Sequence, residues 1–308
     1  MRIRTRERAA GRANPSRCML IRGVMNFGIA ATLTALLTGC LVQNRTPLPP
    51  APVAPSLQSA TLEELLEKVR TQQEAIQTLD AIVQIEPSVT SEQKGEIVTY
   101  RDVRAFLLIR KPAHLRMIGQ YPVVRNMAFD LVSDGERFGL YIPSKNRYIV
   151  GNSEGGKRSK SALENLRPQH LLDALLIEAP ETGREQAALE VATEGRKSYY
   201  IVLILRHGDA GGLLLARKLW FERERLTLER LHNFDPQGKV ETDARYSSYS
   251  EFSGIAYPQR IVLDRPQDNY GLMLSVTEMK FNQPLQDDKF QMAQPAGAEL
   301  VDMERTPS

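Results

Sequence analysis

The chain has 308 residues, of which 42% are apolar and 25% charged, a composition of ordinary globular proteins rather than of disordered or fibrous ones. The formal net charge of +3 is misleading, because the first 39 residues hold seven arginines against the single acid Glu7. The remainder carries 33 basic and 36 acidic residues, so bulk charge gives no reason to expect nucleic-acid binding.

Cysteine and histidine usage argues against cross-links and metals. The two cysteines are Cys18 and Cys40, and a cut before Cys40 would leave one of them, which excludes an internal disulfide. The four histidines lie far apart and have no cysteine near them, which excludes a structural zinc site of the usual spacing. We therefore expect no metal and no cofactor.

Residues 1–39 have the parts of a bacterial export signal: a basic start, an apolar run over 27–37, and small residues before Cys40. The run of about ten residues is too short to cross roughly 30 Å of hydrocarbon. Leu37-Thr38-Gly39-Cys40 resembles the lipobox of bacterial lipoproteins, which implies that Cys40 takes a diacylglycerol and becomes the mature N-terminus. The long arginine-rich start raises the hypothesis that translation begins at Met19.

The residues after Cys40 predict a lipid-anchored tether over 40–58. Residues 45–55 include five prolines and should form a stiff, extended spacer between the membrane and a folded domain over 59–308. Leu41 follows the cysteine where, in bacteria resembling enterobacteria, Asp retains lipoproteins in the inner membrane. A leucine in this position therefore favours anchoring in the inner leaflet of the outer membrane, facing the periplasm.

One amphipathic helix is expected first in the folded domain. Thr61 and Glu64 have the spacing of a capping box, and apolar residues follow at helical intervals over about 18 residues. A second helix is expected over 168–178, with Pro168 in its first turn.

Most of the remaining chain is typical of antiparallel strands. Short segments rich in Val, Ile, Leu, Tyr and Phe alternate with turn signals such as Asp235-Pro-Gln-Gly238. They predict a mainly β (α+β) domain, in which about a dozen antiparallel strands form a strongly curved sheet that two helices cover. The expected strands lie near 81–87, 97–110, 114–120, 125–133, 136–142, 146–150, 187–193, 198–206, 213–223, 226–234, 239–248, 258–265 and 270–280.

No motif nominates a catalytic site. Residues 151–158 match the phosphate-loop spacing until Arg158, which stands where a magnesium-binding Ser or Thr is needed, so a basic exposed loop is the better interpretation. Neither a Gly-x-Ser-x-Gly elbow nor a dinucleotide glycine fingerprint occurs. We expect a binding protein rather than an enzyme.

Some strand segments are continuously apolar, notably 106–109, 199–205 and 213–215. A sheet open to water on one face should alternate apolar and polar residues. Both faces of these strands should therefore be covered, by helices or by something apolar held in the concavity. An ordinary thick core explains the runs equally well.

The chain resembles the lipoprotein-localisation carriers and receptors of the LolA/LolB family. The resemblance rests on Val103–Met117 with its basic-basic-Pro turn, on Leu131-Val-Ser-Asp-Gly135, on Leu140-Tyr-Ile-Pro143, and on Lys289-Phe-Gln-Met-Ala-Gln-Pro-Ala-Gly297. It spans roughly 60–302. The family has Arg before the turn proline, where it helps to fasten a lid, whereas this chain has Lys111 before Pro112 and so departs from that pattern.

The resemblance implies a strongly curved, incomplete antiparallel barrel of about eleven strands, covered by helices and enclosing an apolar cavity that shields acyl chains. The expected function is therefore a membrane-anchored, periplasm-facing lipoprotein that binds lipid or lipoprotein acyl chains and acts in lipoprotein localisation, with other lipoprotein-transport components as partners. The alternative is an envelope structural or sensing protein that binds a protein partner with the same fold. Residues expected to line the cavity are Phe106, Leu108, Leu115, Met117, Phe129, Leu131, Leu140, Leu203 and Trp220.

Overall fold

A computed structural model describes residues 56–91, 96–99, 102–153, 166–208 and 211–304, which belong to the compact unit Pro55–Ser308. The expected export signal, the lipobox with Cys40, the proline-rich run and most of the loop after Gly151 lie outside the described residues. No helix in the described ranges is long and apolar enough to cross a membrane.

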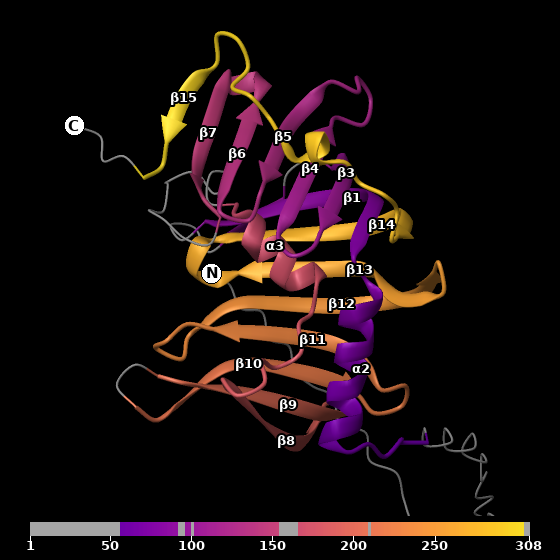
Figure 1. The fold of residues 1–308 in the computed structure, drawn as a ribbon. Coiled ribbons are helices and arrows are strands. Elements are labelled where there is room, and N and C mark those ends of the chain that lie inside the picture. Colours follow the sequence, from indigo (N-terminus) through magenta and orange to yellow (C-terminus); the bar gives the residue numbers. More distant parts are fainter. Residues whose placement is uncertain (1–55, 92–95, 100–101, 154–165, 209–210, 305–308) are drawn as a thin grey trace, which may run out of the picture. The chain divides into compact units, whose positions relative to one another are not determined.

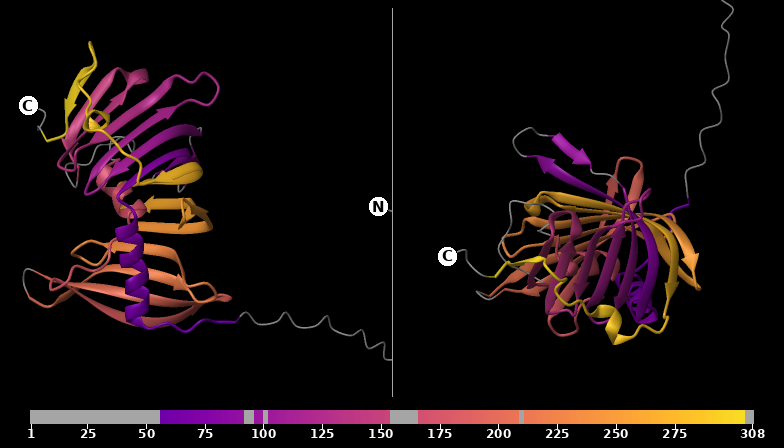
Figure 2. Two further views of the ribbon diagram at one scale, coloured as in Figure 1. Left: turned by 45° about the vertical axis from the view of Figure 1, so that its right-hand side comes forward. Right: turned by 90° about the horizontal axis from the view of Figure 1, so that it is seen from above.

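The unit is mainly β and consists of one large, curved, open sheet (Figures 1 and 2). Fourteen strands follow one path, β15-β7-β6-β5-β4-β3-β1-β14-β13-β12-β11-β10-β9-β8, and β2 pairs with β1 beside it. Every pairing is antiparallel except that of β15 with β7. The strands are β1 (Thr78–Ser91), β2 (Glu96–Thr99), β3 (Val103–Arg110), β4 (His114–Gln120), β5 (Met127–Ser133), β6 (Arg137–Ile142), β7 (Arg147–Asn152), β8 (Glu185–Glu194), β9 (Lys197–His207), β10 (Leu213–Glu222), β11 (Thr227–Phe234), β12 (Val240–Phe252), β13 (Ile255–Arg265), β14 (Tyr270–Phe281) and β15 (Glu299–Asp302).

The predicted curved antiparallel sheet is confirmed, but the predicted number of strands was too low. Residues 97–110, expected to be one strand, contain β2 and β3. Strand β15 was missed altogether. Both β2 and β15 have four residues, which is too short for side-chain alternation to reveal a strand.

Two α-helices lie among the described residues, α2 (Leu62–Ala75) and α3 (Pro168–Leu175). The predicted capping box is present: Thr61 N donates to Glu64 Oε2 at 2.7 Å, and Glu64 N donates to Thr61 Oγ1 at 3.2 Å. The helix is shorter than expected, because Ile76 is extended and β1 begins at Thr78.

One face of the sheet carries the main core. Side chains alternate across a strand, so residues paired on neighbouring strands point to the same face. One such row runs Leu107, Met117, Leu131, Leu140 and Ile149, and none of these residues is more than 1% exposed. The helices pack on this same face through apolar residues that belong to the same core, among them Leu65, Leu66, Val69, Leu171 and Leu172.

Buried tyrosine hydroxyls attach the end of α3 to the sheet. Tyr246 on β12 donates to the Ala174 carbonyl at 2.9 Å, and Tyr257 on β13 donates to the Leu175 carbonyl at 2.7 Å. These bonds satisfy helix carbonyls that have no partner within the helix. In Figure 1, α3 accordingly lies in front of the middle strands, and α2 runs across the strands from β8 toward β13.

The C-terminal segment lies against the outer side of β3 and β4. It includes the short helix η4 (Asp287–Phe290). Two other short helices lie elsewhere: η1 (Pro143–Lys145) precedes β7, and η3 (Pro266–Asp268) joins β13 to β14. Phe290 is buried, with the Arg110 guanidinium 4.9 Å from its ring centre and the His114 ring edge-on at 5.4 Å. The segment with Phe290 therefore returns the chain to the sheet before β15 pairs with β7.

The predicted hairpin turn after β11 is also present. Gly238 N donates to Asp235 O at 2.9 Å, and the Asp235 carboxylate accepts from the main-chain N–H groups of Gln237 and Lys239. An aspartate at the first position of a turn satisfies exposed main-chain donors in this way.

Candidate ligand-binding pocket

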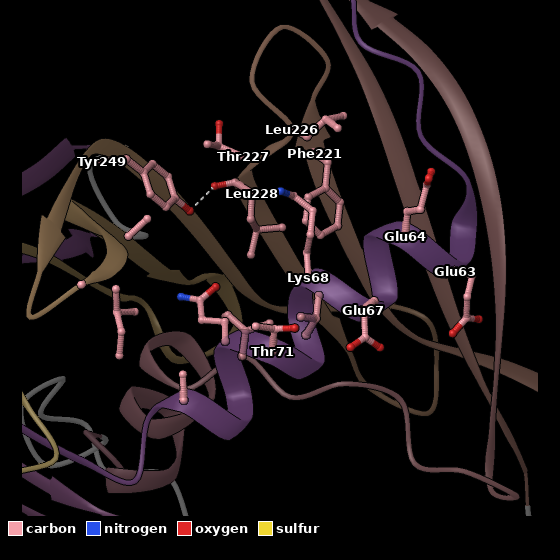
Figure 3. Close-up of a pocket in the computed structure, with 17 residues that line it drawn as sticks. Glu63, Glu64, Glu67, Lys68, Thr71, Phe221, Leu226, Thr227, Leu228 and Tyr249 are labelled. Carbon is pink, nitrogen blue, oxygen red and sulfur yellow. Dashed lines mark hydrogen bonds between the residues drawn. The ribbon is translucent and has the colours of Figure 1, made fainter.

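A pocket of about 680 Å³ lies between α2 and the ends of β10 to β13 (Figure 3). The volume lies within the range of roughly 300–1,000 Å³ that is typical of small-molecule sites. Three segments far apart in sequence form it: one side of α2, the β10–β11 hairpin, and the β12–β13 hairpin. Its lining residues are Glu63, Glu64, Glu67, Lys68, Val69, Thr71, Gln72, Ala75, Ile177, Phe221, Leu226, Thr227, Leu228, Tyr249, Gly254, Ile255 and Ala256.

The strand side of the pocket is apolar. Phe221, Leu226 and Leu228 come from the β10–β11 hairpin, and Ile255 begins β13. Tyr249 donates its hydroxyl to the Leu228 carbonyl at 2.6 Å, so its polar atom is satisfied and its ring faces the pocket as apolar surface (Figure 3). Burial raises the pKa of Tyr249, which keeps this phenol neutral.

Leu226 is in an unusual conformation for its type. Its φ is +53°, in the left-handed region that a branched side chain adopts at a cost of about 1 kcal/mol or more. The hairpin tip nevertheless places an apolar side chain at the pocket. Strain of this kind is concentrated at functional sites in proteins.

The helix side of the pocket is largely polar, with Val69 and Ala75 as its apolar members. Residues Glu64, Lys68, Thr71, Gln72 and Ala75 are three or four positions apart and so share one side of α2. The neighbouring side of α2, which includes Leu65 and Leu66, is buried in the core, so the largely polar side faces the pocket. The pocket therefore has one apolar and one polar wall, an arrangement that suits an amphiphile better than a purely apolar or purely polar ligand.

A smaller polar pocket of about 270 Å³ adjoins the first one at Ile177. Arg217 pairs there with Glu185 at 2.6 Å. Burial raises the pKa of Asp173 to about 6, although a hydrogen bond of 2.7 Å from Gln169 Nε2 opposes that shift. Asp173 consequently changes charge near neutral pH inside the protein.

Five of the nine residues expected to line a cavity lie together on the core face. All are at most 8% exposed, and none lines the α2 pocket. They form part of the packed core between the sheet and α3. These residues are Leu115, Met117, Phe129, Leu131 and Leu140.

The other four expected cavity residues point to the opposite face. Phe106 and Leu108 alternate with the buried Ala105 and Leu107, and Leu203 likewise alternates with core residues of β9. Since one cavity cannot be lined by both faces of a sheet, these four cannot join the other five. Trp220 packs instead against His232, at 4.6 Å between ring centres, with Arg230 and Lys218 over its ring.

Lys111, before Pro112 in the β3–β4 turn, contacts α2. Its ammonium donates to the main-chain oxygen of Gln73, and burial lowers the pKa of Lys111. The Gln73 side chain in turn accepts from Ala179 N at 2.9 Å. Gln73 thus joins α2 to the β3–β4 turn and to the segment after α3.

Comparison with known proteins gives structural likenesses only. No known protein-family profile matches the chain, and no curated protein matches it. A crystal structure of a LolA superfamily protein from Nitrosomonas europaea overlaps with a TM-score of 0.47 at 15% identity, covering 76% of this chain and 99% of that one. A domain named as an outer membrane lipoprotein-sorting protein from Vibrio parahaemolyticus gives 0.48 at 11% identity, covering 74% and 94%.

A DUF1329 family protein from Desulfovibrio piger gives a TM-score of 0.45 at 13% identity, covering 74% of this chain and 94% of that one. Overlap of this degree does not establish a shared family. The family resemblance therefore continues to rest on the sequence motifs, and the site on its own geometry.

Among the described residues, no group of three or more His, Cys, Asp or Glu is arranged to hold a metal ion. The pocket residues themselves were missed by sequence reasoning. The polar stripe on α2 was visible in the sequence, but nothing local showed that two distant hairpins would lie opposite it.

Proposed function

We propose that this chain is a lipid-anchored protein of the bacterial envelope that holds acyl chains in the α2 pocket and acts in localising lipoproteins or other acyl lipids toward the outer membrane. The observation that carries the proposal is the pocket itself, with its apolar wall of Phe221, Leu226, Leu228 and Ile255. Each methylene moved from water into such a site contributes about 0.8 kcal/mol, so binding needs no catalytic group.

The sequence motifs support the envelope location and the lipid class. The lipobox predicts acylation of Cys40, the proline-rich run predicts a spacer, and the LolA/LolB-like motifs imply acyl-chain shielding. The core residues between the sheet and α3 are already packed against one another. A ligand cavity at Met117 or Leu131 would require α3 to move, whereas the α2 pocket is open without that movement.

A transfer assay tests this function. The full chain with Cys40→Ser, which carries no acyl group of its own, is mixed with vesicles that contain a fluorescent fatty acid or a fluorescent triacylated lipopeptide. We expect the label to move to the soluble protein fraction, and to do so less when Leu228→Asp is present. Failure of both labels to move, with no lipid extracted from the purified protein, would contradict acyl binding.

The second candidate function is an envelope protein that binds a protein partner. Strand β8, whose Val191 is 59% exposed, ends the sheet with no further strand beside it in the described part of the chain. Such an edge can pair with another chain. Capture of a protein partner, lost on Val191→Pro while lipid transfer remained absent in every form, would favour this function.

A further inference from the structure

The charged side chains around the α2 pocket differ in whether they have a partner within the protein. Its lining contains three carboxylates and one ammonium, that of Lys68. Glu63 and Glu67 both contact Arg70, at 2.8 and 3.1 Å. Glu64 accepts hydrogen bonds from Thr61, and these lower the pKa of Glu64.

Lys68 is the exception. In the described part of the chain, its ammonium makes no ion pair and no hydrogen bond. Figure 3 shows the Lys68 side chain extending from α2 toward Leu228, beside Phe221, while Glu63 and Glu67 point away from the strand wall. The stem of Lys68 thus follows the apolar wall and leaves the charge at the polar margin, the usual position of a long amphipathic side chain.

This arrangement distinguishes between head groups. A cationic head would have to compete with Arg70 and Thr61 for the three carboxylates, and it would lie beside the unpaired ammonium of Lys68. A neutral head would add no charge partner to that ammonium, which is exposed and would keep only its contact with water. An anionic head placed at the polar margin would pair with Lys68 while its tail covered Phe221, Leu228 and Ile255.

The volume of the pocket limits the number of acyl chains that it can hold. At about 30 Å³ per methylene, close to the liquid volume of a water molecule, a chain of twelve to sixteen carbons fills roughly 350–500 Å³. One such chain fits the pocket of about 680 Å³, so a lipoprotein could place no more than one of its three chains inside it.

From these observations we infer that the α2 pocket binds an amphiphile with a single acyl chain and an anionic carboxylate or phosphate head, held by Lys68. The inference rests on the proposed acyl-binding function and narrows it. The acyl groups of a lipoprotein are attached through uncharged bonds, so this ligand class differs from a lipoprotein anchor.

Displacement of a neutral apolar dye, N-phenyl-naphthylamine, from the full chain with Cys40→Ser tests the inference. Dodecanoate, lauroyl lysophosphatidate and dodecanol are compared as competitors. We expect both anions to compete better than dodecanol, and Lys68→Met to weaken the anions about fivefold while leaving dodecanol unchanged. Lys68→Arg should restore the anions, and Lys280→Met on β14 is the matched control.

The outcomes distinguish the inference of an anionic head group from the proposed acyl-binding function. Stronger competition by dodecanoate identifies a fatty acid as the source of the head group, and stronger competition by the phosphate identifies a lysophospholipid; either supports the inference. Equal weakening of dodecanol and the anions by Lys68→Met, or weakening of the anions by less than about twofold, overturns it while acyl binding stands. Binding of none of the three overturns the inference and the proposed function together.

Discussion

Lys111 donates a hydrogen bond from its ammonium to the main-chain oxygen of Gln73, so the β3–β4 turn is attached to the last turn of α2. Gln73 also accepts from Ala179 through its side chain. A single helical residue therefore connects α2 with the sheet and with the segment that follows α3. Because α2 forms one wall of the pocket, this junction attaches that wall to the sheet.

Replacing Lys111 by Met should loosen α2. The Gln73 carbonyl would lose a charge-assisted partner, which costs about 1–2 kcal/mol of unfolding free energy. Amide exchange over residues 70–76 should increase more than exchange elsewhere in the sheet. Lys145→Met, at an exposed position in η1, is the control. Unchanged amide-exchange protection of α2 in Lys111→Met would show that the Lys111–Gln73 contact does not hold α2 in place.

The tyrosine bonds to α3 should be individually measurable. Tyr257→Phe removes the hydroxyl that donates to the Leu175 carbonyl at 2.7 Å. Because the buried carbonyl loses this hydrogen bond, we expect the free energy of unfolding in denaturant to fall by about 1–2 kcal/mol. Tyr246→Phe should behave similarly through Ala174. Tyr121→Phe, at a residue 37% exposed, should leave stability unchanged, and an equal loss there would contradict the assignment.

Asp173 should make stability depend on pH. Burial raises its pKa from 3.8 to about 6, so the folded state holds a proton that the unfolded state releases. The contribution is complete below the unfolded pKa of 3.8 and is lost as the pH rises through about 6, with an upper limit of about 3 kcal/mol.

Asp173→Asn should remove this dependence. Near pH 4 the variant and the wild type should unfold at similar denaturant concentrations, and near neutral pH the variant should be the more stable. The exposed Asp102→Asn controls for general charge effects. A constant difference between Asp173→Asn and wild type across this range would show that Asp173 has an ordinary pKa.

Leu226 should separate stability from binding. Asn adopts a positive φ more readily than Leu, so Leu226→Asn relieves backbone strain and should not lower the unfolding free energy by more than about 0.5 kcal/mol. The same change removes apolar surface from the pocket and should weaken dye and acyl binding. Calorimetric unfolding and dye titration on the same sample measure both; tight binding by the variant would exclude Leu226 from the site.

Local features of the sequence predicted local structure well. The capping box of Thr61 and Glu64, the hairpin at Asp235–Gly238 and the two helix starts all depend on neighbours along the chain. The curved sheet also followed from the succession of short apolar segments. These features are decided within a few residues, so a single sequence contains them.

Side-chain faces could not be read in the same way. The run 199–205 is apolar throughout and has no alternation to indicate which residues face the core. Bulges in β10 at Leu215/Arg217 and Trp220/Phe221 shift the pairing further, so the position of Trp220 depends on irregular pairing with both neighbouring strands. The α2 pocket was unpredictable for a related reason, since it needs the tertiary arrangement of three distant segments.

Native mass spectrometry of the full chain with Cys40→Ser, purified from a bacterial host, tests acyl binding in the α2 pocket most directly. Two further variants are compared: Ile255→Asp in the pocket wall and Leu203→Asp on the opposite face of the sheet. We predict an adduct with the mass of a single-chain lipid in the parent and in Leu203→Asp, and its loss in folded Ile255→Asp. An adduct that survives Ile255→Asp, or its absence from all three proteins, would contradict the account.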